Sequence, residues 1–165
     1  IIHPFIKRPD RESETEIRGR IYHRCLSLVD FVEDIRSMDE IIDLALREEN
    51  VRANDSLRFE ISKRLADILA DPFMSGFFKT KDGRVIRNEV EIVLKDGNVL
   101  RPDRIVVDRD SVSIIDFKTG KKSSDYKEQL MKYIKVVSAI YPLKKTEGFI
   151  FYIDENSIER VNEKA

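Results

Sequence analysis

The stretch Arg101–Gly120, RPDRIVVDRDSVSIIDFKTG, decides the fold. It contains two segments rich in β-branched residues on either side of a polar turn at Asp108–Ser111, a pattern typical of a β-hairpin. A two-residue loop and a four-residue loop both place Asp103 directly opposite Asp116. An odd loop length, or a bulge near Pro102, would break this register. We therefore expect the two aspartates to face each other across the hairpin.

Asp103, Asp116 and Lys118 are the residues of this hairpin that can carry chemistry. Side chains alternate along a strand, so Asp116 and Lys118 share a face. Cβ atoms of cross-strand neighbours lie roughly 4.5–5.5 Å apart, close enough for both carboxylates to bind one divalent ion. Mg²⁺ takes one or two protein carboxylates plus a phosphate, and a lysine beside it can stabilise charge that develops on the phosphate. The alternative is a surface ion pair, but Asp116 lies in the apolar run IIDF, which favours burial.

These residues resemble the signature of the PD-(D/E)XK nuclease superfamily. The resemblance is to its RecB-like branch in particular, which includes the AddA and RecB helicase–nucleases. The matching motifs are Asp103-Arg104-Ile105, the segment Ile114–Gly120 (IIDFKTG), and Tyr126, Gln129 and Tyr133 in the spacing Y-x-x-Q-x-x-x-Y. One departure is Arg101-Pro102, which stands where the family more usually has a glycine-containing turn.

The resemblance implies a deoxyribonuclease that uses Mg²⁺ or Mn²⁺ to hydrolyse phosphodiester bonds, with Lys118 as a catalytic residue. The metal ligands that it implies are His23, Asp103, Asp116 and the backbone carbonyl of Phe117. His23 follows Gly19 in the family's G-x-x-x-H context. Helical periodicity alone places His23 opposite the apolar stripe of its helix and would favour an exposed histidine. Gly19 lies one turn earlier on the same face, where it would leave room for backbone or DNA to approach closely.

The helix that follows the hairpin supplies the remaining candidate site residues. Tyr126, Gln129 and Tyr133 lie along one edge of its apolar stripe, so both tyrosine rings could belong to the core. The family implies that Gln129 and Tyr133 take part in catalysis and, with Tyr126, bind the DNA backbone. Lys121 and Lys122 add a local basic cluster that could attract phosphates.

Glu89 is a weaker candidate metal ligand. Residues 88–92, NEVEI, resemble the acidic strand that precedes the catalytic hairpin in AddA-type nucleases. A three-residue loop at Lys95–Gly97, with Gly97 in the left-handed conformation, would pair Glu89 with Asp103. A two-residue turn would direct Glu89 to the other face, and Glu91 cannot be separated from Glu89 by pattern.

The order of the predicted elements indicates an α/β fold. After an irregular lead-in, 1–12, a helical segment covers 13–70, and a catalytic core covers 84–153 within a single domain, 1–165. The helices are expected over 13–37, 39–50, 55–70 and 124–141, and the strands over 84–94, 98–108, 111–118, 147–153 and 157–161. This order predicts a restriction-endonuclease-like mixed β-sheet flanked by helices.

Composition narrows the protein class. Charged residues form 37% of the chain but the net charge is −1, so binding to nucleic acid through charge alone is not expected. The single cysteine, Cys25, excludes an internal disulfide and a four-cysteine iron–sulfur cluster. No signal peptide or membrane span is apparent, so we expect a cytoplasmic protein without a membrane partner.

The chain begins at Ile1 rather than at a methionine. We therefore expect an exonuclease-type domain excised from a RecB/AddA-like helicase–nuclease that acts in DNA recombination and double-strand break repair. Its partners would be single-stranded or duplex DNA ends, a helicase motor in the same full-length chain, and a second subunit. The alternatives are a catalytically inactive DNA-binding or scaffolding domain of the same fold, and a standalone CRISPR-associated or junction-resolving nuclease.

Overall fold

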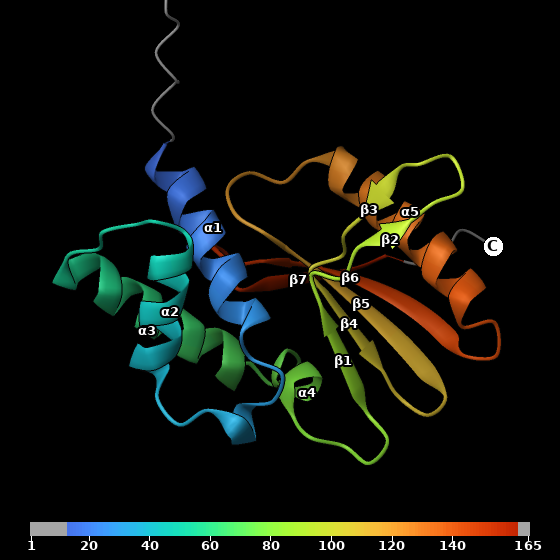
Figure 1. The fold of residues 1–165 in the computed structure, drawn as a ribbon, viewed down its shortest axis with the longest axis horizontal. Helices are drawn as coiled ribbons and strands as arrows, with labels where there is room; N and C mark the ends of the chain where they lie inside the picture. The colour runs from blue at the N-terminus through green and yellow to red at the C-terminus, as the bar shows by residue number, and fades with distance from the viewer. Residues whose placement is uncertain (1–12, 162–165) are drawn as a thin grey trace, which may run out of the picture.

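The computed structural model describes residues 13–161 and has an α/β architecture built on a five-stranded mixed sheet (Figure 1). The strand order is β1-β4-β5-β6-β7, in which β5 and β6 are parallel and the other neighbours are antiparallel. These strands are β1 Val85–Asn88, β4 Arg104–Val107, β5 Ser111–Lys118, β6 Lys145–Tyr152 and β7 Ser157–Val161. Two further short strands, β2 Ile92–Val93 and β3 Val99–Leu100, form a separate hairpin. The prediction of a restriction-endonuclease-like mixed sheet flanked by helices is confirmed.

Helices cover both faces of the sheet (Figure 1). The elements are α1 Glu14–Ser27, the 3₁₀ helix η1 Val32–Asp34, α2 Met38–Glu48, α3 Asp55–Ala70, α4 Ser75–Phe78 and α5 Ser124–Ile140. Alternation along β5 directs Ile115 and Phe117 toward the core that α1–α3 form, and Ile114 toward the core that α5 forms. Asp116 and Lys118 have the same parity as Ile114, so they belong to the α5 face.

The register of the hairpin formed by β4 and β5 is the predicted one. Arg104 pairs with Ile115, and the same antiparallel register places Asp103 opposite Asp116. The prediction of a continuous strand over 98–108 is wrong, because β3 ends at Leu100 and β4 begins at Arg104. Pro102 lies in this interruption, and proline has no N–H to donate to a ladder.

The prediction of one strand over 84–94 is also wrong. The chain leaves β1 after Asn88, and Glu89 has a φ of 48°, which turns the backbone away from the sheet direction. The backbone N–H of Glu89 still donates to the carbonyl of Asp103 at 2.9 Å. The hairpin that follows has the three-residue loop, because Leu94 N–H donates to the carbonyl of Asn98 and Gly97 has a φ of 85°.

The first helix is shorter than predicted: α1 ends at Ser27, and residues 28–37 contain only η1. Helix α1 begins with a capping box in which Ser13 and Glu16 exchange hydrogen bonds. At its other end, the carbonyls of Val29 and Asp30 accept hydrogen bonds from Arg104 rather than from a following helical turn. The remaining predicted helices are confirmed within two residues, and α4 was not predicted.

Arg104 is fully buried, at 0% exposure, in β4. Its guanidinium donates to the carbonyls of Val29, Asp30 and Phe77 and to the side-chain oxygen of Asn88, at 2.6–3.0 Å. It lies 4.0 Å from the centre of the Phe78 ring. Burial lowers the pKa of Arg104 to about 10, although the charge of Asp30 opposes this shift. One charged side chain therefore joins the linker after α1, the end of β1, and α4.

Two further features of the described residues bear on function. Cys25 lies in α1, is fully buried as a free thiol, and has a pKa that burial raises to about 12. Among residues 13–161, no helix combines the length and the apolar character that crossing a bilayer requires.

Candidate active site

His23 and Asp103 meet at one end of the sheet. Asp103 immediately precedes β4 and Lys118 ends the antiparallel strand β5, so both lie at this end. Nδ1 of His23, from α1, lies 3.3 Å from Oδ1 of Asp103, and the backbone N–H of Phe117 donates to Oδ2 at 2.7 Å. Two separate segments, α1 and β5, thus fix the orientation of the Asp103 carboxylate.

Asp116 and Lys118 form an ion pair beside this carboxylate. Nζ of Lys118 lies 2.7 Å from Oδ2 of Asp116, which is only 2% exposed. This contact is electrostatic rather than a directed hydrogen bond, because no donor reaches Oδ2 in hydrogen-bonding geometry. Burial, together with the negative charge of Asp103, raises the pKa of Asp116 to about 6, although Lys118 opposes the shift.

The two carboxyls have opposite pKa shifts. Burial acts to raise the pKa of Asp103, but its hydrogen bonds with His23 and Phe117 and the nearby charges outweigh burial, so its pKa lies below the ordinary value. Burial acts to lower the pKa of His23, and Asp103 reverses this effect and raises it. Carboxyls whose environments push their pKa values apart are a common mark of an active site.

Helix α5 adds Gln129, Tyr133 and Tyr126 to the same place. Nζ of Lys118 donates to Oε1 of Gln129 at 3.1 Å, and Nε2 of Gln129 donates to the hydroxyl of Tyr133 at 2.8 Å. Nζ of Lys118 also lies 4.9 Å from the centre of the Tyr126 ring. Tyr133 is buried, with 5% exposure, and its hydroxyl is also hydrogen-bonded to the carbonyl of Arg101 at 3.4 Å.

A cavity of about 600 Å³ opens beside His23 and Asp103. Glu89 lines it and accepts a hydrogen bond from the guanidinium of Arg24 at 3.1 Å. Glu91 is exposed and does not line the cavity, so the structure separates the two acids that pattern alone could not. The three-residue loop described above is the alternative that pairs Glu89 with Asp103.

Gly19 and Thr119 bring α1 against the end of β5. A Cβ atom at Gly19 would lie 2.7 Å from Oγ1 of Thr119, closer than van der Waals contact allows. The absence of a side chain therefore lets α1 approach the strand end that carries Lys118. The group that approaches Gly19 closely, as expected, is the side chain of Thr119.

Lys121 and Lys122 are not brought to the carboxylates. Lys122 pairs with Glu155 at 2.8 Å and lies 4.6 Å from the centre of the Tyr152 ring. Lys122 lines a different cavity, at the start of α5, and Lys121 is exposed.

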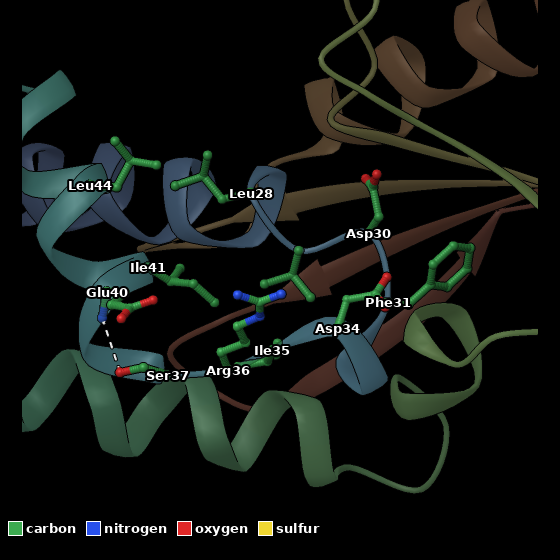
Figure 2. Close-up of a pocket in the computed structure, with 11 residues that line it drawn as sticks. Leu28, Asp30, Phe31, Asp34, Ile35, Arg36, Ser37, Glu40, Ile41 and Leu44 are labelled. Atoms are coloured by element: carbon green, nitrogen blue, oxygen red, sulfur yellow. Dashed lines mark hydrogen bonds between the residues drawn. The ribbon is translucent and has the colours of Figure 1, made fainter.

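Figure 2 shows another cavity, of about 380 Å³, between the end of α1, η1 and α2. It includes none of the predicted site residues. Its wall includes the N-cap of α2, where the side chain of Ser37 accepts a hydrogen bond from the backbone N–H of Glu40 at 3.4 Å. The remaining wall is a mixture of apolar side chains and charges of both signs.

Sequence reasoning assigned no role to Arg104 and Thr119, although both lie in the matching motifs, and it did not consider Arg24. Arg104 carried a signal, because a charged residue that opens the apolar run RIVV of a predicted strand must be either exposed or paired with buried polar groups. The contacts of Arg24 and Thr119 depend on how α1 packs across the sheet end. No local pattern reports that packing.

The donor set fits a divalent metal ion, although no three or more His, Cys, Asp and Glu side chains within residues 13–161 already surround a common centre. The fit rests on Oδ2 of Asp116, a buried carboxylate oxygen without a hydrogen-bond donor. It rests also on the neighbouring Asp103, since two carboxylates in a buried site repel each other unless a cation joins them. Mg²⁺ requires only one or two protein carboxylates, with water and phosphate completing its shell.

Comparison with known proteins identifies the family. The family model described as the PD-(D/E)XK nuclease superfamily matches residues 4–165. The search of curated proteins gave no match. A solved structure titled "Crystal structure of SSO0001" is similar over 90% of this chain and 67% of that chain, with 17% sequence identity and a TM-score of 0.33. Because the family model covers almost the whole sequence, the chain belongs to the PD-(D/E)XK nuclease superfamily.

Proposed function

We propose that this protein is a DNA nuclease of the RecB/AddA-like branch, that residues 1–165 form one nuclease domain, and that Asp103, Asp116 and Lys118 are its catalytic centre. Membership of the superfamily implies metal-dependent nuclease activity in general, and DNA as the substrate. The observation that carries the assignment is the buried, repelling pair of carboxylates with Lys118 2.7 Å from Asp116.

Each residue has a distinct part in this proposal. Asp103 and Asp116 would bind Mg²⁺ or Mn²⁺, with His23 and the carbonyl of Phe117 as further ligands. Glu89 is an additional candidate, because it lines the same cavity. When bound, such an ion polarises a phosphoryl oxygen and lowers the pKa of a water molecule. Lys118 would stabilise the negative charge that develops on the phosphate.

The support for the RecB/AddA-like branch is local. The IIDFKTG strand end and the Gln129–Tyr133 pair of that branch are both present, and hydrogen bonds join them through Lys118. We propose exonuclease-type action on DNA ends, in recombination and double-strand break repair. The helicase motor that this branch implies would lie outside these 165 residues, which contain no G-x-x-x-x-G-K-[ST] phosphate-binding loop.

Replacement of the lysine tests the proposal. Lys118→Ala should lower the rate of cleavage of single-stranded and end-bearing DNA in Mg²⁺ by about a hundredfold or more, because one charge-stabilising group is lost. Affinity for the same DNA in Ca²⁺ should remain close to that of the wild type. Lys135→Ala is the matched control, because Lys135 is exposed on the same helix that supplies Gln129.

Turnover at the wild-type rate by Lys118→Ala would overturn the assignment. A wild-type protein that binds DNA but does not cleave it in Mg²⁺ or Mn²⁺ would instead indicate the inactive DNA-binding domain.

A further inference from the structure

A chain of hydrogen bonds runs from Lys118 to the backbone just before Asp103. Nζ of Lys118 donates to Oε1 of Gln129 at 3.1 Å, and Nε2 of Gln129 donates to the Tyr133 hydroxyl at 2.8 Å. The Tyr133 hydroxyl then donates to the carbonyl of Arg101 at 3.4 Å, a long bond. The chain therefore links β5, α5 and the interruption between β3 and β4.

The direction of each bond in this chain is determined by its two ends. An ammonium group only donates hydrogen bonds and a backbone carbonyl only accepts them. Gln129 must therefore turn its oxygen toward Lys118, since the opposite orientation would set the amide NH₂ against the ammonium. Its NH₂ group then faces Tyr133, whose hydroxyl accepts this bond and gives its own hydrogen to the carbonyl of Arg101.

We propose that Gln129 and Tyr133 are positioning residues, which fix the direction and place of the Lys118 ammonium rather than contact DNA. This inference rests on the proposed function. Tyr133 acts only through Gln129: its hydroxyl prevents the amide from rotating, and the amide oxygen retains the ammonium beside Asp116.

Burial separates this role from a DNA contact. Tyr133 is 5% exposed and its hydroxyl is already hydrogen-bonded at 2.8 Å. A phosphate oxygen only accepts hydrogen bonds, so it could bond to this hydroxyl only in place of the Arg101 carbonyl, whereas groups that contact the DNA backbone are ordinarily accessible. Loss of the hydroxyl should therefore change the rate of the chemical step and leave DNA affinity unchanged.

The far end of the chain holds the Tyr133 hydroxyl in place. The carbonyl that accepts its hydrogen bond belongs to Arg101, which is followed by Pro102 and Asp103. The interruption of the predicted strand at Pro102 frees this carbonyl from the ladder between β1 and β4. The departure from the family pattern thus lies at an anchor point of the lysine.

Steady-state kinetics and DNA affinity should be measured for the wild type, Gln129→Ala, Tyr133→Phe and the double variant. Removal of a hydrogen bond to a charged group should lower kcat about ten- to a hundredfold in Gln129→Ala, and about tenfold in Tyr133→Phe. The dissociation constant for DNA in Ca²⁺ should stay within about twofold, and the double variant should equal Gln129→Ala alone, because Tyr133 acts through Gln129. The control is Tyr141→Phe, which makes the same chemical change at the C-cap of α5.

A second measurement does not depend on cleavage. In NMR spectra, the side-chain amide signals of Gln129 should shift in Tyr133→Phe and remain in place in Tyr141→Phe. Three results would each overturn the inference: unmoved amide signals of Gln129, losses of kcat that multiply in the double variant, or weakened DNA binding at unchanged kcat. If the wild type is active, the proposed function stands in all three cases. An inactive wild type would overturn both.

Discussion

Asp116 shows how the surroundings of one residue set its chemistry. Its pKa of about 6 lies above the ordinary value of 3.8, chiefly because burial disfavours the charged carboxylate and Asp103 repels it. A group whose pKa is higher in the folded than in the unfolded protein stabilises the fold at low pH. That contribution is lost as the pH rises through the folded value. Metal-free protein should therefore lose stability between about pH 4 and pH 6 on account of Asp116.

Asp116→Asn should remove this pH dependence. Above pH 6 the metal-free variant should be more stable than the wild type by about 3 kcal/mol, because asparagine never ionises, and the difference should vanish near pH 4. Urea unfolding with a chelator at several pH values measures this difference in the free energy of unfolding. Mg²⁺ should raise the midpoint of thermal unfolding of the wild type at pH 8, but not that of the variant. Asp110→Asn, in the exposed turn between β4 and β5, is the control. A difference in free energy of unfolding between Asp116→Asn and the wild type that stays the same across this pH range would contradict the argument.

Most of the candidate site residues could be predicted from the sequence, but the hydrogen bonds that join them could not. Strand alternation and hairpin register bring Asp103, Asp116 and Lys118 together from sequence alone. The helical wheel turns His23 away from the core, and that direction proves to be toward Asp103. The partner of Tyr133 is a carbonyl 32 residues away in sequence, and no local pattern predicts such a pairing.

At the level of elements, the contact between α1 and the end of β5 determines where His23 lies. Gly19 touches Thr119 one turn before His23 on the same helix, so a side chain at position 19 would push α1 away from the strand. The distance between His23 and Asp103 depends on how closely α1 approaches the end of β5, because His23 belongs to α1 and Asp103 is hydrogen-bonded to Phe117 of β5.

Gly19→Ala should reduce cleavage by about tenfold, since small displacements of catalytic groups slow chemistry strongly. Thr119→Ala in the same chain should restore much of the activity, because it removes Oγ1, the atom that a Cβ at position 19 would meet. The double variant should be at least as stable as the wild type, because alanine favours a helix interior over glycine by about 1 kcal/mol. Rates and thermal unfolding are the measurements. Gly76→Ala, where a Cβ meets nothing within 4 Å, is the control, and failure of Thr119→Ala to rescue would count against the contact.

Element boundaries were less predictable than element types. The two strands predicted over 84–94 and 98–108 are divided, at Glu89 and near Pro102, because the chain must leave the main sheet and form the β2–β3 hairpin before it returns. Their hydrophobic pattern continues across the break, so periodicity alone reads each as one strand. The end of α1 was missed for a similar reason: its apolar stripe continues through Val32 and Ile35, which pack against the core without being in the same helix.

For the whole molecule, Arg104 joins the helical layer to the sheet. Its four acceptors belong to the linker after α1, to β1 and to α4, and all of them depend on one guanidinium. It also immediately follows Asp103, so the same residue that unites the layers anchors the strand that carries a site carboxylate.

Arg104→Met should lower the free energy of unfolding by about 3 kcal/mol, because it leaves buried oxygen acceptors without donors. Urea unfolding measures the loss. The control is Arg87→Met, because Arg87 is an exposed arginine of β1 that donates a hydrogen bond to the neighbouring carbonyl of Ile86; this variant should change stability by less than about 0.5 kcal/mol. Arg104→Lys should lie between the two, since an ammonium can satisfy only part of the acceptor set. Equal stabilities of Arg104→Met and Arg87→Met would show that the layers are united by apolar packing alone.

The buried thiol of Cys25 has a practical consequence for studying this molecule in motion. It is the only cysteine of the chain, and its burial and raised pKa keep it from reacting as a thiolate. Fluorescent or spin labels can therefore be attached at two cysteines introduced on the surface, without first replacing the native one. The distance between α1 and the β2–β3 hairpin could then be followed in an otherwise unaltered core while nucleic acid enters and leaves.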